Sequence, residues 1–261
     1  MTSPNHFRFK HLQWIFPLLL CIFLVAVWSV LVARKVLQPT IVPSPSQTIL
    51  AALEFRDTLA ADFLATLWEV ILGFLITVGL AMVAAIALHV LPRLSQAMYG
   101  LLLVLQSVPL FAVAPVLFSV FGSGLGIRLI VIILVAFFPV LVNTAEGLRR
   151  IDPELLDLFG SMNATTWQKL MLLEIPSALA MVFAGSKITL TMCVIGAVLA
   201  EMLVGDMTGL GYRIKSANAF FRADLVFACI ALLSLMSVVL YALLTLSERR
   251  FQPWTSREEG R

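Results

Sequence analysis

Long apolar stretches alternate with short polar segments along most of this sequence. Six stretches are long enough to cross the ~30 Å hydrocarbon core of a bilayer as an α-helix, which takes about 20 residues. They cover residues 14–33, 63–91, 97–121, 127–147, 179–204 and 223–246. The pattern therefore predicts an all-α integral membrane protein with six transmembrane helices, in a single membrane domain over residues 14–246.

The segments that flank this domain are polar. Residues 1–13 are predicted to be a short N-terminal segment, and residues 247–261 a charged tail. The first apolar stretch is too long for a secretory signal peptide and lacks a small-residue cleavage site, so an uncleaved span is expected. A short surface helix is expected over residues 46–55.

Composition agrees with a membrane protein and excludes several other classes. The chain of 261 residues is 61% hydrophobic and 13% charged, whereas soluble domains are about 45–50% apolar and ~25% charged. A net charge of only +3, without a basic and aromatic patch, argues against nucleic acid as a partner. The three cysteines lie in apolar runs, where they are expected to be small buried side chains.

Basic residues predict the orientation in the membrane. Six spans place both termini on one side, and that side collects ten of the 18 Lys and Arg residues, against seven on the other, with Lys187 inside a span. Because cytoplasmic loops are richer in Lys and Arg, both termini are expected in the cytoplasm. The same rule places residues 143–176 there.

Residues 143–176 form the longest polar-rich interruption, and their capping signals predict two short helices joined by a turn. Asp152 can cap the first helix and Pro153 suits its first position. Asn163 suits a left-handed helix stop. Thr165 followed by Gln168 is a capping box that begins a second helix, which is expected to end near residue 176.

Apolar residues recur at helical spacing in both short helices. They are Leu155, Leu156, Leu158, Phe159 and Met162 in the first, and Trp167, Leu170, Met171 and Leu173 in the second. Two interpretations are open from spacing alone: the hairpin is a docking surface for a partner, or it connects two spans and rests on the bilayer.

The motifs of enzymes and nucleotide-binding proteins are missing from the sequence. No Gly-Lys dipeptide occurs, so there is no phosphate-binding Gly-x-x-x-x-Gly-Lys loop. The three histidines are too dispersed for a metal site, and no hydrolase motif is present. We therefore expect neither an enzyme nor a bound cofactor or metal.

Polar residues inside spans are costly in lipid and mark candidate functional positions. Candidates for lining a translocation pathway are Glu69, Gln106, Ser107, Asn143 and Glu201. The alternative is that neighbouring helices satisfy each of them. A further hypothesis pairs Lys187 with Glu146 across the fourth and fifth spans.

The hairpin resembles the signature loop of bacterial ABC-importer permeases, which has Glu-Ala-Ala, three residues, Gly, nine residues and Ile-x-Leu-Pro. That spacing falls here on Asp157-Leu158-Phe159, Asn163 and Leu173-Glu174-Ile175-Pro176. Three elements depart from the pattern: Asp stands for Glu, Leu-Phe for Ala-Ala, and Asn for Gly. Further motifs resemble the nitrate/sulfonate/taurine branch: Pro43-Ser44-Pro45-Ser46, Gly73-Phe74, Phe137-Phe138-Pro139, Asn143-Thr144, Asp152-Pro153-Glu154-Leu155 and Gly209-Leu210-Gly211-Tyr212.

This resemblance implies the permease subunit of an importer in the bacterial inner membrane, with the type I permease fold and a cytoplasmic coupling hairpin over residues 148–176. It implies a homodimer of permeases, two ABC ATPase subunits that carry ATP and Mg, and an external solute-binding protein. The residues expected to dock the ATPase are Asp157, Leu158, Phe159, Met162, Asn163 and Trp167. Stretches such as Gln106-Ser107-Val108-Pro109 look more like permeases for the thiamine-precursor pyrimidine than like sulfonate transporters.

Two other functions are open from the sequence. One is a self-contained secondary transporter or channel that uses Glu69 and Glu201 for ion coupling. The other is a membrane scaffold whose loop recruits a soluble protein.

Overall fold

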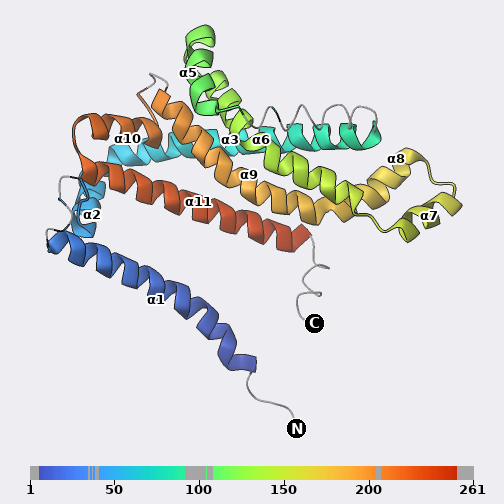
Figure 1. Ribbon diagram of the computed structural model, residues 1–261, viewed down its shortest axis with the longest axis horizontal. Helices are drawn as coiled ribbons and strands as arrows, with labels where there is room; N and C mark the ends of the chain where they lie inside the picture. Colours follow the sequence, from blue (N-terminus) through green and yellow to red (C-terminus); the bar gives the residue numbers. More distant parts are fainter. Residues whose placement is uncertain are drawn as a thin grey trace. The chain divides into compact units, whose positions relative to one another are not determined.

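The computed structural model describes residues 6–34, 36, 38, 41–91, 104, 108–203 and 207–251, so the predicted pathway residues Gln106 and Ser107 lie outside the described part. All regular secondary structure within these residues is helical (Figure 1). The elements are α1 (His6–Ala33), α2 (Pro45–Glu54), α3 (Arg56–Val90), α5 (Leu110–Phe121), α6 (Leu125–Arg149), α7 (Pro153–Ser161), α8 (Thr166–Lys169), η1 (Leu170–Glu174), α9 (Ile175–Leu203), α10 (Leu210–Ala219) and α11 (Ala223–Phe251).

Four of the described helices are long and apolar enough to cross a membrane. They cover Arg56–Val90, Leu125–Arg149, Thr166–Leu203 and Ala223–Arg250. Two shorter apolar helical segments, Ile22–Ala33 and Ala112–Phe121, fall inside two further predicted spans. Over the described residues the structure thus confirms an all-helical architecture with four candidate membrane spans, and the count of six spans stays a prediction.

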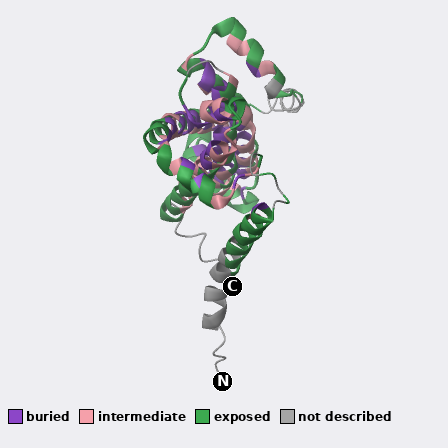
Figure 2. Cartoon of the chain, turned by 90° about the vertical axis from the view of Figure 1, so that its left-hand side faces the viewer, coloured by how far each residue is buried: buried purple, intermediate pink, exposed green. Residues whose placement is uncertain are grey.

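The chain forms two compact units. The first comprises residues 1–59 and 214–231, and the second comprises residues 60–213 and 232–261. Within the first unit the Trp28 and Phe227 rings pack 5.6 Å apart between centroids, and the Arg222 guanidinium bonds Asp224 at 2.9 Å and lies over the Phe55 ring. Buried residues, purple in Figure 2, are concentrated in the helices of the second unit, whereas most described residues of α1 are exposed.

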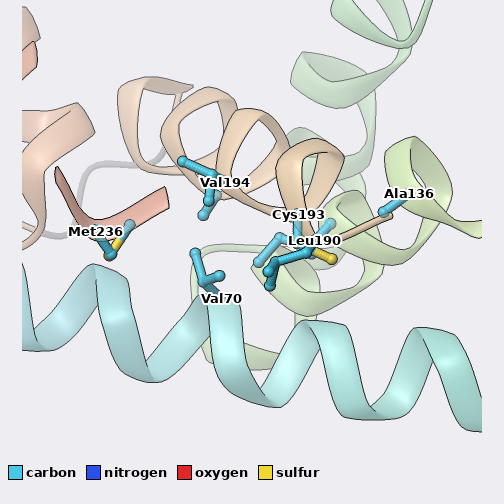
Figure 3. Close-up of a cluster of buried hydrophobic side chains, with 8 residues drawn as sticks. Val70, Ala136, Leu190, Cys193, Val194 and Met236 are labelled. Carbon is cyan, nitrogen blue, oxygen red and sulfur yellow. The ribbon is translucent and has the colours of Figure 1, made fainter. Parts of the chain in front are cut away.

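The main apolar core of the second unit is built from four helices. Val70 of α3, Ile132 of α6, Cys193 of α9 and Met236 of α11 are each at most 1% exposed. Figure 3 shows the side chains of α3, α9 and α11 converging on one another. Cys193 and Cys229 are buried free cysteines, as predicted for small apolar side chains.

Helices α6 and α9 pack closely along their length because glycines stand at their contacts. An added Cβ on Gly185 would lie 3.0 Å from the Pro139 carbonyl oxygen, and one on Gly147 would lie 2.9 Å from the Met181 side chain. Apolar burial gives little driving force in lipid, so such close van der Waals contact between helices carries much of the stability. The packing fixes the segment α7–α8, which connects these two helices.

Candidate functional site

The segment between α6 and α9 forms the two short helices that the sequence predicts. The Asp152 carboxylate accepts a hydrogen bond from the Glu154 N–H at 2.9 Å, and Pro153 stands at the first position of α7. Asn163 has a φ of 54°, in the left-handed region, and ends the first helix. Thr165 and Gln168 form the predicted capping box at the start of α8. The local structure is therefore confirmed.

The second helix does not end near Pro176, so that expectation is wrong. α8 passes through the π-helical turn η1, in which the Ile175 N–H bonds the Leu170 carbonyl, and continues into α9. A proline ring normally clashes with the carbonyl four residues before it. For Pro176 that carbonyl belongs to Leu172, inside the widened π-turn. The turn makes room for the ring, and the hairpin joins the span without a break.

The hairpin carries exposed apolar side chains and buries none of its own in α7 or α8. Leu158, Met162 and Trp167 are 53%, 68% and 64% exposed. Asp157 is exposed and Phe159 is half-buried. Figure 1 shows α7 and α8 extending beyond the ends of α6 and α9. Apolar side chains of this size on a protruding element are typical of a surface that a partner covers.

The inner end of the hairpin is anchored to the bundle. Leu170 and Leu173 of η1 are buried, and the Glu174 carboxylate lies 3.0 Å from the His89 ring at the end of α3. Both side chains of this contact are largely buried, at 14% and 26% exposed. The start of the span α9 and the end of α3 are therefore in direct contact with this end of the hairpin.

A second polar site lies at the other end of α9, where three successive backbone N–H groups meet side-chain oxygens. The Gly209 N–H donates to Asp62 at 3.1 Å, the Leu210 N–H to Thr66 at 2.9 Å, and the Gly211 N–H to Glu201 at 2.6 Å. These groups open α10, whose first N–H groups have no partner within the helix. Side chains of α3 and α9 thus cap α10.

The capping side chains also bond one another and one basic residue. The Thr66 hydroxyl donates to the Glu201 carboxylate at 2.7 Å. The Arg213 guanidinium donates to the other oxygen of Asp62, also at 2.7 Å. Glu201 is 1% exposed and Thr66 is fully buried. A fully satisfied network of this kind holds its helices in one arrangement.

Gly209 and Gly211 are required by this network. Gly209 has a φ of +100°, and a Cβ there would collide with the Glu201 carboxylate. A Cβ on Gly211 would lie 2.6 Å from the Val198 carbonyl oxygen. The Gly-Leu-Gly-Tyr motif thus has a physical reason, which is the approach of backbone to a buried carboxylate.

Glu69, the other predicted carboxylate, pairs with Arg128 of α6. Their atoms Oε1 and Nη1 lie 2.7 Å apart, and the side chains are 4% and 10% exposed. Asn143 donates its amide to the Pro139 carbonyl at 2.7 Å. Glu69, Glu201 and Asn143 therefore all bond groups of this chain, and their role in a pathway stays a prediction.

The sequence analysis missed Asp62, Thr66 and Arg213 as members of this network. Asp62, Thr66 and Glu69 follow one another at helical spacings of four and three residues, which place them on one face of α3. A polar stripe of this kind in an apolar span was the available signal. The predicted second span begins at residue 63 and leaves Asp62 outside, so the stripe was not recognised.

The hypothetical pair of Lys187 and Glu146 is wrong. Lys187 bonds Glu248 of α11 at 2.6 Å, and Glu146 bonds Arg150 on its own helix at 2.9 Å. Helix α11 runs past residue 246 to Phe251, which brings Glu248 within reach. The sequence analysis had placed Glu248 in the tail.

Long apolar helices, a buried ionic network and a protruding capped hairpin are consistent with a helical membrane-transport protein. The chain matches the family described as "Binding-protein-dependent transport system inner membrane component" over residues 77–253. It belongs to this family and is thus the permease subunit of an ABC importer, a multi-pass protein of the inner membrane. It is not an enzyme, and family membership excludes the self-contained secondary transporter.

Two relatives and one solved structure agree with this assignment. The formylaminopyrimidine transport permease protein ThiX of Halalkalibacterium halodurans is 31% identical over 93% of this chain and 96% of its own. The putative aliphatic sulfonates transport permease protein SsuC of Bacillus subtilis is 29% identical over 96% and 91%. A chain of the MetNI methionine ABC transporter is 18% identical, with a TM-score of 0.59 over 72% of this chain and 94% of its own, which shows a similar fold.

Proposed function

We propose that this permease takes up a small organic solute, delivered by an external solute-binding protein, and that the α7–α8 hairpin couples this uptake to a separate ATPase. Two copies of the chain form the pathway, and two cytoplasmic ATPase subunits bind ATP and Mg. ATP binding closes the ATPases, which push the hairpins. The spans then rock from an inward-facing to an outward-facing state.

The protruding hairpin is the observation that carries this proposal. It exposes Leu158, Met162 and Trp167 to solvent, while both of its helices have capped N-termini and its η1 end is anchored to the bundle. An exposed apolar surface that continues into a membrane span without a loop suits force transmission, because a flexible loop between the two would absorb the movement of the ATPase. The predicted docking residues Asp157, Phe159 and Asn163 lie on the same segment.

The orientation belongs to the same proposal. The excess of Lys and Arg places both termini and the hairpin in the cytoplasm, on the side where ATP is available. The second interpretation of the hairpin, that it rests on the bilayer surface, predicts no ATPase contact and is separated by the experiment below.

The transported solute is proposed to be a pyrimidine or similar heterocycle, or else a sulfonate, taurine or nitrate-like anion. ThiX, 31% identical to this chain, is named for formylaminopyrimidine transport. SsuC, 29% identical, is named for the transport of aliphatic sulfonates. Both similarities extend over nearly the whole chain.

The double variant Asp157→Arg/Phe159→Arg tests whether the hairpin docks the ATPase. We expect the ATPase to be lost from the purified complex, because binding would bury two unpaired positive charges in an apolar interface. Asn218→Arg is the matched control. Asn218 is exposed on α10, in a loop predicted on the opposite side of the membrane, so the added charge is expected to leave the complex intact.

The readouts are co-purification of the ATPase and the ATP turnover of the reconstituted complex. Retention of the ATPase with normal turnover in the double variant would refute docking through the hairpin.

A further inference from the structure

Lys187 places a positive charge in the membrane-spanning part of α9, where an unpaired charge is costly. Its ammonium lies 2.6 Å from the Glu248 carboxylate of α11. It also lies 5.9 Å from the centre of the Tyr241 ring. The lysine and glutamate side chains remain 21% and 23% exposed. The pair is therefore accessible, in contrast to the nearly inaccessible pair of Glu69 and Arg128.

A cavity of about 420 Å³ opens beside this pair, between α9 and α11. Its lining residues are Ala184, Lys187, Ile188, Thr191, Met192 and Tyr241. Ile188 and Tyr241 are 47% and 45% exposed, so the cavity faces outward from this chain. Volumes of about 300–1,000 Å³ are typical of small-molecule sites.

The lining and the Glu248 carboxylate, which bonds the lining residue Lys187, bring four chemical features together. The ammonium is a hydrogen-bond donor and the adjacent carboxylate is an acceptor. The Tyr241 ring offers an aromatic face, and Ala184, Ile188 and Met192 supply apolar surface. Charged side chains inside a span usually face protein or water rather than lipid. The cavity beside Lys187 is expected to do the same.

The charge balance of the cavity distinguishes between classes of solute. Lys187 and Glu248 cancel each other, so a sulfonate would meet the carboxylate at the same point as the ammonium. A neutral aminopyrimidine has ring nitrogens that accept hydrogen bonds, an amino group that donates them, and a flat face that stacks on an aromatic ring. The ring nitrogens and the flat face match Lys187 and Tyr241 of the lining, and the amino group matches the Glu248 carboxylate beside Lys187.

We propose that the cavity is a solute-binding site on the translocation pathway and that it binds a neutral heteroaromatic ring with amino substituents. This inference rests on the proposed uptake function and chooses between the two solute classes left open there. The site is formed by Lys187, Glu248 and Tyr241, with Thr191 at its wall.

The first test measures uptake in proteoliposomes that contain the permease, its ATPase and its binding protein. The probes are formylaminopyrimidine and ethanesulfonate. Tyr241→Leu is expected to lower pyrimidine uptake about tenfold, the effect of one lost favourable contact. Tyr241→Phe, which keeps the ring, is expected to transport normally. Equal uptake by Tyr241→Leu and wild type would overturn the inference.

The double variant Lys187→Met/Glu248→Gln removes both charges without leaving either one unpaired, so it is expected to fold. We expect it to co-purify with the ATPase as the wild type does and to lose pyrimidine uptake. Unchanged uptake would overturn the inference. Failure of the wild-type complex to assemble or to couple ATP hydrolysis to uptake would instead contradict the proposed function.

The second test measures exposure to water and does not depend on transport. Thr191→Cys, in a chain whose native cysteines are replaced by alanine, is treated with a charged thiol reagent with and without ATP and Mg. Leu243→Cys is the control, because Leu243 is exposed on the opposite face of α11 from Tyr241.

We expect Thr191→Cys to react, Leu243→Cys to stay unreactive, and formylaminopyrimidine to protect Thr191→Cys where ethanesulfonate does not. Lack of reaction at both positions would show that the cavity faces lipid. Equal protection by both probes, or by neither, would contradict the solute class. Each of these results overturns the inference.

Discussion

Gly209 shows how a single residue without a side chain fixes one end of the permease. Its N–H bonds Asp62, its φ of +100° is a left-handed value, and the Glu201 carboxylate occupies the space that a Cβ would need. Residues with side chains rarely adopt such angles, at a cost of about 1–3 kcal/mol. The capping of α10 by α3 and α9 therefore depends on this position.

Gly209→Ala is expected to lower the melting temperature of the purified permease, with a loss of about 1–3 kcal/mol from the backbone angle and more from the collision. Gly79→Ala is the control, because a Cβ at Gly79 in α3 meets nothing within 4 Å. Alanine in a helix is favoured over glycine by about 0.5–1 kcal/mol, so this control is expected to be neutral or stabilising. Equal melting temperatures for Gly209→Ala and wild type would show that the cap does not contribute to stability.

Local signals in the sequence predicted the caps of the hairpin but not the network around Glu201. Asp152, Asn163 and Thr165 act on N–H groups or backbone angles within a few residues, so spacing alone reveals them. The partners of Glu201 are Thr66, far away in the sequence, and Gly211, in the first turn of α10. Such contacts depend on how the helices pack, which no local pattern specifies. The pairing of Lys187 failed for the same reason.

At the scale of elements, the π-turn η1 sets how the hairpin is rotated relative to α9. Helix α8 runs through Leu170–Glu174 into the span without a loop. Each residue of an α-helix turns the chain by about 100° and advances it by about 1.5 Å. The π-turn therefore determines which way Trp167 and the rest of α8 face.

Deletion of Leu172, whose side chain is 67% exposed, removes the extra residue of the π-turn. The Met171 carbonyl then lies four residues before Pro176, and its clash with the proline ring is expected to kink the helix where the hairpin joins α9. The spans are expected to fold, since the core residues of α9 follow the deletion. ATP-driven uptake in proteoliposomes is expected to fall about tenfold, within the range typical of coupling free energies.

Leu172→Ala keeps the register and is the control for loss of the side chain alone. Normal uptake by the deletion variant would show that the direction in which the hairpin leaves α9 does not matter for coupling.

Element positions were largely predictable, whereas one boundary was not. The apolar stretches place α3, α6, α9 and α11 because membrane spans are marked by length and composition. The helix end predicted near Pro176 was wrong. The π-turn before this proline removes the clash that would normally break the helix. A turn type that depends on one extra residue leaves no signal in hydropathy.

At the scale of the molecule, the chain is a permease subunit without a nucleotide-binding motif of its own. It belongs to a family of transport permeases and contains no phosphate-binding Gly-x-x-x-x-Gly-Lys sequence. Energy must then enter through a contact with another protein. In the proposed mechanism, the apolar side chains of the hairpin make this contact, and the His89–Glu174 contact and the continuous helix into α9 carry the motion into the bundle.

A photo-crosslinking amino acid in place of Leu158, in membrane vesicles that contain the whole transporter, tests this energy transfer most directly. Leu158 is 53% exposed on the hairpin. Coupling through the hairpin predicts a crosslink to the ATP-hydrolysing subunit, with a yield that changes when ATP and Mg are added. A crosslink only to lipid, or only to a protein outside the cell, would contradict it.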